Sequence, residues 1–551
     1  MRPKLSSADP SSHQHFQNLS STSLDVHHDC TAQPGGTRHM DDDRRSADGH
    51  ADIVRDVFAH LAQTDILFKK IASAQDGCID ASALAAKRRL RRLVDSTRSS
   101  DFADDASGAL DVALARLTTL TRLCDHKFVA YSYNSIPIVW RAIYVHAQLL
   151  KACCILIPRS SRNTEEESNR LQLCIRDLDL ALIVAGAASI GEDQNCHDLI
   201  SALQQRLLDL PREDHTIPSR PQNQDGDPPL AKRRRLLDLD TDNAQFEARA
   251  QADSSIPEYS SHQAPSFMDL ADPDSLHRAK PFVVRAFAQN AGWPAVQPSC
   301  HRSWSSAEHL MSAAGPARVV PVEVGANYAR QDWGQDMMLW DDFLKHCHWD
   351  TSLTPDPKRS PRNSSNAHLP VLYMAQHDLA SQFPALSQDF YLPEYVYTSP
   401  PPPPDWPDYA PPAMPDGAIT NVWIGPAGTV SPPHFDPFYN CFVQVVGHKE
   451  VWAAPPICRP IRTRTAAGLQ TADSTEQSND ADARAESSVT DTLMSNTSDV
   501  DVFGTDEVVA SQVRFAAFRS VLGPGDLLYL PPGWWHSLRS LTRSASVSTW
   551  F

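Results

Sequence analysis

Gly425-Pro-Ala-Gly-Thr-Val-Ser-Pro-Pro-His-Phe-Asp436 is the stretch on which the interpretation of this chain depends. It contains a His-x-Asp pair, and residues i and i+2 of a β-strand point to the same side. The imidazole of His434 and the carboxylate of Asp436 could therefore reach one metal ion from a single strand. A second stretch, Gly525 to His536, offers another imidazole in His536. Because His-x-Asp often arises by chance, a packed, hydrogen-bonded histidine is the alternative.

Two polar residues follow this pair at short distances along the chain. Asn440 lies six residues after His434, and Lys449 lies fifteen after it, beside an apolar run. A buried lysine needs an anionic partner, because an unpaired buried charge is costly. A bound dicarboxylate would supply that partner. An exposed lysine on an edge strand is the other interpretation. The candidates of the first paragraph, His434, Asp436 and His536, are two histidines and one carboxylate, which is the ligand set of non-haem Fe(II) oxygenases.

From about residue 280 onward the apolar pattern has the period of β-strands. Short apolar runs alternate with Gly/Pro turns, which predicts a β-sandwich or barrel. The runs are 318–324, 371–374, 420–424, 441–446, 450–453, 526–530 and 544–550. Two low-complexity segments interrupt them, the prolines around Pro400–Pro404 and a polar insertion at 459–511. We expect neither to contribute much to the core, and the insertion to be disordered.

The first half of the chain shows other patterns. Residues 1–50 are polar without an apolar period, which predicts a disordered tail. Residues 51–210 have helical periodicity and predict an all-α domain, with Pro137 opening one helix. Residues 211–279 are expected to form a linker. Its run Lys232–Arg235 has the composition of a nuclear import signal, so we expect nuclear localisation, with the cytoplasm as a second compartment.

Composition narrows the function classes. The net charge is −17, with 67 acidic and 50 basic residues, which disfavours direct nucleic-acid binding and suits a basic protein partner. The 11 cysteines include no C-x-x-C pair, which indicates a reducing compartment without a structural zinc site. No run of 18 apolar residues is present, so we expect no membrane span.

Taken together, these motifs resemble a known family. The region 280–551 is similar to the JmjC-domain oxygenases, in particular the branch named lysine-specific demethylase 8, whose members act as arginyl hydroxylases. The similarity is carried by the His434 segment and by Val320–Gly325, Tyr373–Leu379 and Ser546–Trp550. The resemblance implies an α+β protein: an N-terminal helical domain followed by a double-stranded β-helix (a jelly-roll, cupin-like domain).

The resemblance also implies a role for each matching residue. His434, Asp436 and His536 would bind Fe(II), and the cosubstrates would be 2-oxoglutarate and O₂. Lys449 would pair with the distal carboxylate of 2-oxoglutarate. The remaining cosubstrate residues would be Tyr373, Ser431, Asn440 and Trp550, and the substrate pocket would contain Glu323, Trp333 and Trp423. Phe435, Phe438 and Tyr439 depart from the polar residues expected around the metal motif.

Three functions remain open at this stage. The preferred one is hydroxylation of an arginine side chain, because a carboxylate such as Glu323 can grip a guanidinium and tryptophan faces can stack on it. The second is demethylation of N-methyl-lysine, since tryptophan faces also bind methylated ammonium groups. The third is a catalytically silent module for chromatin or protein interaction. The expected substrate is a histone or another ribosome- or chromatin-associated protein.

Overall fold

A computed structural model describes the parts of the chain that carry these motifs. The described residues are 57, 106–131, 135–157, 163–211, 255–325, 333–349, 371–414, 417–456, 496–498, 500–504 and 517–551. All of them belong to one unit, Asp42–Phe551. The predictions made for residues 1–50, for Lys232–Arg235 and for 51–105 apart from Val57 lie outside the described residues.

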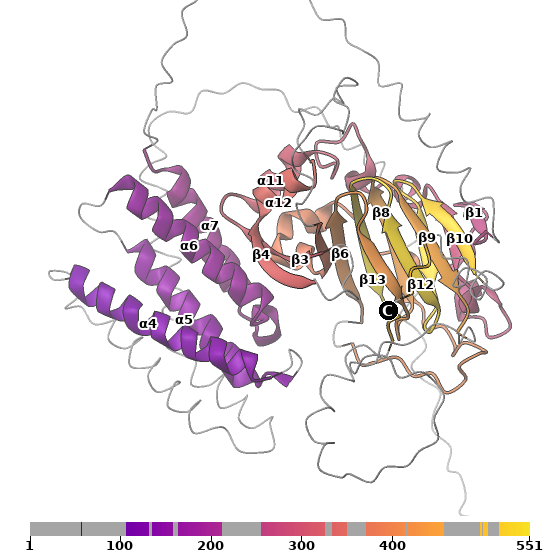
Figure 1. Ribbon diagram of the computed structural model, residues 1–551, viewed down its shortest axis with the longest axis horizontal. Helices are drawn as coiled ribbons and strands as arrows, with labels where there is room; N and C mark the ends of the chain where they lie inside the picture. The colour runs from indigo at the N-terminus through magenta and orange to yellow at the C-terminus, as the bar shows by residue number, and fades with distance from the viewer. Residues whose placement is uncertain are drawn as a thin grey trace, which may run out of the picture. The chain divides into compact units, whose positions relative to one another are not determined.

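Four long helices form the described part of the N-terminal region (Figure 1). They are α4 (Ala106–Val129), α5 (Ile138–Leu156), α6 (Thr164–Ile183) and α7 (Asp193–Leu208), with the short η3 (Ala187–Ile190) before α7. The helix α5 begins directly after Pro137, as predicted, and every residue in it except Ile138 and Lys151 is buried. It is long and apolar enough to cross a membrane, but 89% of its apolar window is buried inside the protein. A helix that is apolar all round and buried in this way is typical of the core of a helical bundle.

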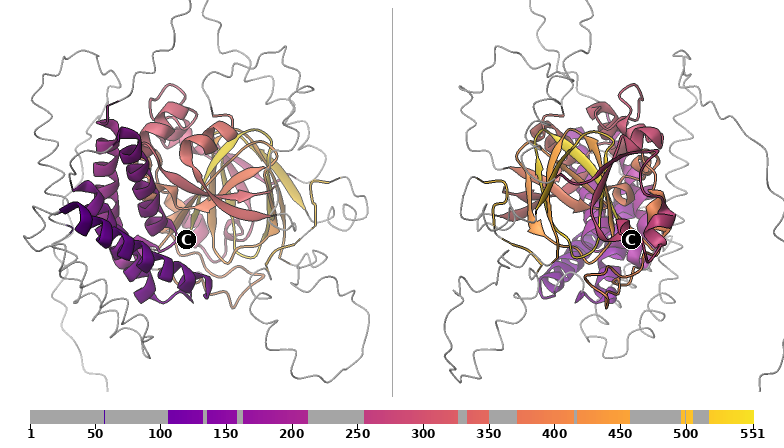
Figure 2. Two further views of the ribbon diagram at one scale, coloured as in Figure 1. Left: turned by 60° about the vertical axis from the view of Figure 1, so that its left-hand side comes forward. Right: turned by 90° about the vertical axis from the view of Figure 1, so that its right-hand side faces the viewer.

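Eight strands form the jelly roll that the resemblance implies, seen from two sides in Figure 2. Consecutive strands alternate between two sheets, one ordered β11-β8-β13-β6 and the other β10-β9-β12-β7, except that β9 and β10 are antiparallel neighbours in the same sheet. Their bounds are β6 (Ile419–Gly425), β7 (Val430–His434), β8 (Asn440–Val446), β9 (Lys449–Ala454), β10 (Phe518–Leu522), β11 (Leu527–Leu530), β12 (Trp535–Ser540) and β13 (Ser544–Trp550). Val283, Phe442, Val451 and Leu538 belong to one buried cluster built from both sheets. The predicted α+β class with a cupin-like domain is confirmed.

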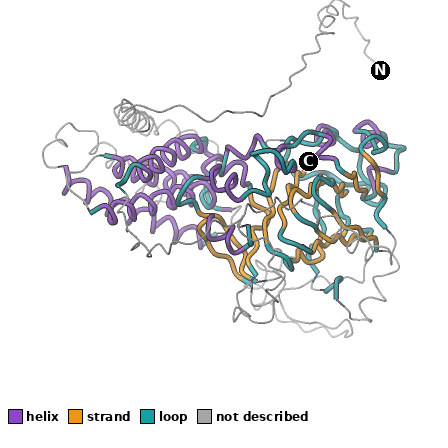
Figure 3. The backbone as a smooth tube through the Cα atoms, turned by 90° about the horizontal axis from the view of Figure 1, so that it is seen from above, coloured by secondary structure: helices purple, strands orange, loops and turns teal. Residues whose placement is uncertain are grey.

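The larger sheet continues beyond the jelly roll on both sides. β1 (Glu258–Ser260) and β2 (Phe282–Arg285) extend one edge, and β5 (Leu372–His377), β3 (Val319–Val324) and β4 (Gly334–Leu339) extend the other. Short helices pack against it: α9 (Phe267–Ala271), α10 (Phe287–Asn290), α11 (Ala307–Ala314), α12 (Trp340–His346), α13 (Leu379–Gln382), η4 (His277–Ala279), η5 (Pro294–Val296), η6 (Pro384–Gln388) and η7 (Glu394–Tyr397). Figure 3 shows these helices and strands in separate colours along the backbone.

The structure corrects the expected extent of three segments. Residues 255–279, assigned to the linker, contain β1, which pairs with β2 in parallel. The stretch after Pro400–Pro404 was expected to add little core, yet Tyr409 is buried and joins the main cluster. The insertion 459–511 was expected to be disordered, but Thr497 and Ser498 are buried and pair with β7. The composition of these segments shows that they are polar, but it does not show which buried groups of the β-domain they pack against.

One buried carboxylate joins the helical region to the strands that border the site. Asp179 of α6 accepts hydrogen bonds from Arg318 Nε and Nη2 at 2.9 and 2.7 Å and from the Val319 amide at 2.9 Å. Gln382 Nε2 also donates to it at 2.8 Å, and its Oε1 accepts from His377 at 2.6 Å. Because β3 and β5 are antiparallel neighbours, the start of β3 and the end of β5 are fixed at the same place.

Candidate active site

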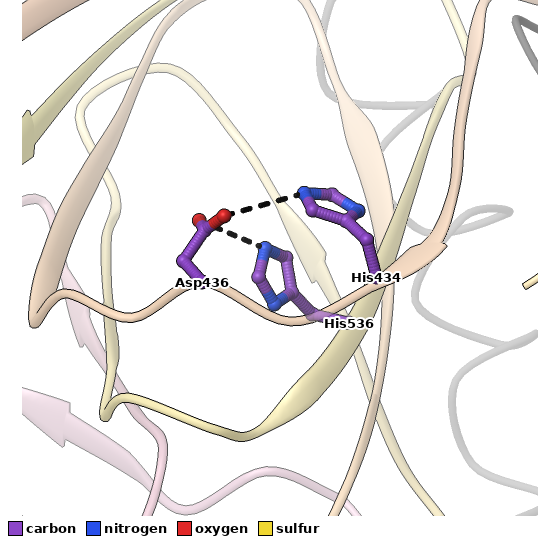
Figure 4. A group of neighbouring side chains, drawn as sticks. All are labelled: His434, Asp436 and His536. Atoms are coloured by element: carbon purple, nitrogen blue, oxygen red, sulfur yellow. Dashed lines mark ion pairs between the residues drawn. The ribbon is translucent and has the colours of Figure 1, made fainter. Parts of the chain in front are cut away.

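Three side chains meet inside the jelly roll as a candidate metal centre (Figure 4). His434 ends β7 and lies opposite His536 of the neighbouring strand β12. Asp436 lies two residues beyond the end of β7, so the pair does not project from one strand as the pattern predicted. Asp436 still lies 4.0 Å from His434 Nε2 and 3.6 Å from His536 Nε2. One ligand atom from each residue lies within 4.8 Å of the others, a spacing that a single ion can span.

The protein backbone orients both imidazoles toward this point. His434 Nδ1 lies 2.8 Å from the Pro432 carbonyl, and His536 Nδ1 lies 3.0 Å from the Trp534 carbonyl. A carbonyl oxygen only accepts, so each Nδ1 must carry the proton and each Nε2 has a free lone pair. Burial, and then the proximity of His434, lowers the pKa of His536 to about 4. At neutral pH this ring is therefore in the uncharged form that binds metal, and the three residues fit a divalent ion.

Lys449 is the second unusual feature of the interior. It is 1% exposed, which excludes the exposed edge-strand alternative. Its Nζ donates to the Tyr373 hydroxyl at 3.1 Å and lies 5.2 Å from the centroid of the Phe442 ring. Burial lowers the pKa of Lys449 to about 7. Among the described residues, no carboxylate forms an ion pair with it, so an entering anion would be its first charged partner.

A single cavity connects the three candidate ligands with Lys449. Of the residues predicted from the sequence, Tyr373, Ser431, Asn440, Trp423 and Trp550 also line it. Sequence reasoning missed four further lining residues, Phe442, Leu530, Leu538 and Ser548. The Ser548 hydroxyl donates to Asn440 Oδ1 at 3.0 Å and fixes that amide. The period-two pattern was the available signal for them: Phe442, Leu538 and Ser548 each lie two residues from a predicted site residue on the same strand, and Leu530 ends an apolar strand.

Two indole donors in this cavity lack an acceptor among the described residues. The indole N–H groups of Trp423 and Trp550 are buried and, among the described residues, find no hydrogen-bond partner. Trp550 is held by Phe438, whose ring stacks on it at 5.2 Å with an angle of 12° between planes. Buried donors without partners are uncommon, so a cavity lined by them suits an oxygen-rich ligand.

Glu323 and Trp333 lie beside the cavity and do not line it. Glu323 of β3 is directly opposite Tyr373 of β5, which places the two side chains on one face of the sheet. The Tyr373 ring is 6.0 Å from that of Trp423. Burial raises the pKa of Glu323 to about 7, and the neighbouring Trp333 side chain opposes part of that increase. The structure thus brings a half-buried carboxyl and three aromatic rings to one side of the cavity.

Comparisons with known proteins agree with this architecture. The cupin-like domain family matches residues 271–551, just over half of the chain. Jumonji C domain-containing protein 5 of Drosophila melanogaster is 32% identical over 47% of this chain and 52% of its own length. Lysine-specific demethylase 8 of Xenopus tropicalis is 30% identical over 49% of the chain and 48% of its length. The protein of the same name in Danio rerio is 26% identical over 75% and 81%, respectively.

The fold and the matched region define a cupin-like jelly-roll domain with a His-Asp-His cluster in its interior. The chain belongs to the cupin-like JmjC-domain family. The match spans about half the length of the first two relatives described above.

Proposed function

We propose that this protein is an Fe(II)- and 2-oxoglutarate-dependent protein oxygenase whose preferred substrate group is an arginine side chain. The observation that carries the proposal is the pairing of a buried His-Asp-His cluster with a buried lysine in one cavity. The cluster suits Fe(II), and the lysine suits the second carboxylate of a dicarboxylate. Iron with 2-oxoglutarate and O₂ would supply the oxidising power that inserts oxygen into an unactivated C–H bond.

The protein's own residues would bind the metal and the cosubstrate, orient the substrate, and exclude water from the cavity. His434, Asp436 and His536 would hold the metal, which would supply the site where the cosubstrate and O₂ react. Lys449 would donate a charge-assisted hydrogen bond to the distal carboxylate of the cosubstrate, with the Tyr373 hydroxyl beside it. The proximity of these groups would align cosubstrate and substrate before the reaction begins.

Glu323 favours arginine as the substrate group. A guanidinium has five donors in a planar fork that matches a carboxylate. An arriving guanidinium would favour the ionised form of Glu323, whose pKa is about 7 without it, so binding would release a proton near neutral pH. Substrate capture should therefore strengthen as the pH rises through about 7. The net charge of −17 also favours a basic protein partner.

Demethylation of N-methyl-lysine is the second candidate function. Relatives in Xenopus tropicalis and Danio rerio carry the name lysine-specific demethylase 8. The faces of Trp423 and Trp333 could bind a methylated ammonium through cation–π attraction. A catalytically silent interaction module is the third, and the complete set of candidate ligands together with Lys449 weighs against it.

Intact-mass analysis of peptides separates the candidates. Arginine-containing and methyl-lysine-containing peptides would be incubated with the protein, Fe(II), 2-oxoglutarate and air. Hydroxylation adds one oxygen atom to the arginine peptide, whereas demethylation removes one methylene from the methyl-lysine peptide. Efficient loss of methyl groups with untouched arginine peptides would replace the preferred substrate and leave the oxygenase proposal in place.

Glu323→Gln tests the arginine assignment while it preserves the shape of the side chain. Hydrogen bonds to charged groups contribute about 1.5–3 kcal/mol, and about 1.4 kcal/mol corresponds to a tenfold factor in rate. We expect kcat/KM for an arginine peptide to fall roughly ten- to a hundredfold. Peptide-independent consumption of 2-oxoglutarate should change much less. Equal losses in both reactions would assign Glu323 to the folding of β3 instead.

A further inference from the structure

A short part of the polar insertion lies against the strand that carries His434. Residues 496–498 and 500–504, here called the strap, follow a long stretch outside the described residues. Thr497 forms an antiparallel bridge with His434. The Ser498 amide donates to the Pro433 carbonyl at 2.8 Å, and the Phe435 amide donates to the Asn496 carbonyl at 3.1 Å. Asn496 Nδ2 also donates to the Phe435 carbonyl at 2.8 Å.

These contacts matter because β7 is poorly held without them. It is the last strand in its sheet and pairs only with β12 among the named strands. Pro432 and Pro433 have no N–H group, so β7 offers few hydrogen bonds of its own. The strap satisfies backbone groups of Pro433 and Phe435, the residues on either side of His434. Phe435 is also the residue between the two candidate ligands, His434 and Asp436.

The strap has a second anchor on the outer face of the same sheet. Val502 is buried in a cluster with Trp452 and Trp535, and Phe435 and Phe503 pack against it. The Phe435 ring meets that of Trp535 edge-on at 5.1 Å. Phe435, which stands where a polar residue was expected, and the strap therefore belong together, because the Phe435 ring packs against the same cluster as the strap residues Val502 and Phe503.

Two arginines fix the distal end of the strap. The guanidinium carbons of Arg519 and Arg539 lie 5.8 and 4.6 Å from the centroid of the Phe503 ring. Arg519 Nη2 also donates to the Val502 carbonyl at 2.8 Å, and both arginines pair with Glu450. Cation–π contacts of this kind are worth more where water is partly excluded.

We infer that the strap is a positioning segment for the metal ligands His434 and Asp436. It holds the proline-containing strand β7 against β12, so that the His434 imidazole keeps its place opposite His536. The inference rests on the proposed metal site. It gives the inserted segment a role in metal affinity that sequence composition alone does not assign.

The test is Mn(II) binding to the full-length protein without cosubstrate, with thermal melting measured in parallel. Two strap variants are used: Asn496→Asp removes the donor to Phe435, and Phe503→Ala removes the ring between the arginines. Phe503→Leu restores apolar bulk, and Tyr397→Ala is the matched control, since Tyr397 is 76% exposed. Mutation of a residue that holds a metal ligand in place typically lowers metal affinity by about 10–100-fold.

We expect the Mn(II) Kd to weaken about tenfold in Asn496→Asp and Phe503→Ala, with partial recovery in Phe503→Leu and no change in Tyr397→Ala. Unchanged Mn(II) affinity in both strap variants, with or without a lower melting temperature, would overturn the inference. A wild-type protein that binds no Mn(II) would instead contradict the proposed metal site. Asn496→Asp keeps the size of the side chain, so it remains informative if Phe503→Ala does not fold.

Discussion

Replacement of Lys449 by methionine removes the buried ammonium and keeps a side chain of similar length. Lys449 is the one cationic group that lines the cavity among the described residues, apart from the histidines. A charge-assisted hydrogen bond to the cosubstrate carboxylate should contribute about 1.5–3 kcal/mol. At about 1.4 kcal/mol per factor of ten, Lys449→Met should weaken 2-oxoglutarate binding roughly ten- to a hundredfold.

The pH dependence of 2-oxoglutarate affinity is an independent test of the role of Lys449. Burial lowers the pKa of Lys449 to about 7, and only the protonated amine pairs with a carboxylate. Affinity for 2-oxoglutarate should therefore be greatest below pH 7 and fall by up to about tenfold for each pH unit above it. Lys449→Arg is the matched control, because a guanidinium stays charged throughout this range and should remove that decline.

Calorimetric titration of 2-oxoglutarate into the Mn(II)-loaded protein measures both effects without turnover. Equal affinity for wild type and Lys449→Met would refute the assignment of this lysine to the cosubstrate. An affinity for the wild type that does not change between about pH 6 and pH 9 would show that Lys449 keeps its charge despite burial.

The remaining predictions concern the metal, the helical region and localisation. Asp436→Ala should abolish 2-oxoglutarate turnover without altering the circular dichroism of the fold; normal succinate formation would exclude this carboxylate as a ligand. Asp179→Ala leaves Arg318 buried without its partner and should lower the free energy of unfolding, measured in urea, by about 3–5 kcal/mol. A loss below about 1 kcal/mol is typical of a solvent-exposed ion pair and would contradict the burial of this one. Alanine at Lys232–Arg235 should move a tagged protein out of the nucleus, and continued nuclear accumulation would show that import depends on another segment.

The sequence predicted the candidate metal cluster because its ligands belong to short patterns. His434 and Asp436 are two residues apart, and His536 follows a strand whose apolar period is clear. The geometry of the pair was still mistaken in one respect, since β7 ends at His434 and Asp436 lies in the following loop. The prolines before His434 and after Asp436 limit the ladder there, and spacing alone does not show where a strand stops.

Other features could not be predicted because they depend on distant partners. Asp179 and Arg318 are 139 residues apart, and neither lies in a pattern that pairs it with the other. The strap lies in a polar insertion, and Val500, Val502 and Phe503 are its own apolar residues. Their burial follows from the outer face of β9 and β12, which carries Trp452 and Trp535. A local pattern cannot report a surface formed elsewhere in the chain.

The most direct test of the proposed activity is the formation of succinate from 2-oxoglutarate, measured together with product mass in one reaction. With Fe(II), air and a basic arginine-containing peptide, the wild-type protein should form succinate and oxygenated peptide in equal amounts. His434→Ala should form neither, while it retains the wild-type fold. Absence of succinate from the metal-loaded wild type with both arginine and methyl-lysine peptides would contradict the oxygenase proposal, and undiminished turnover by His434→Ala would contradict the metal centre.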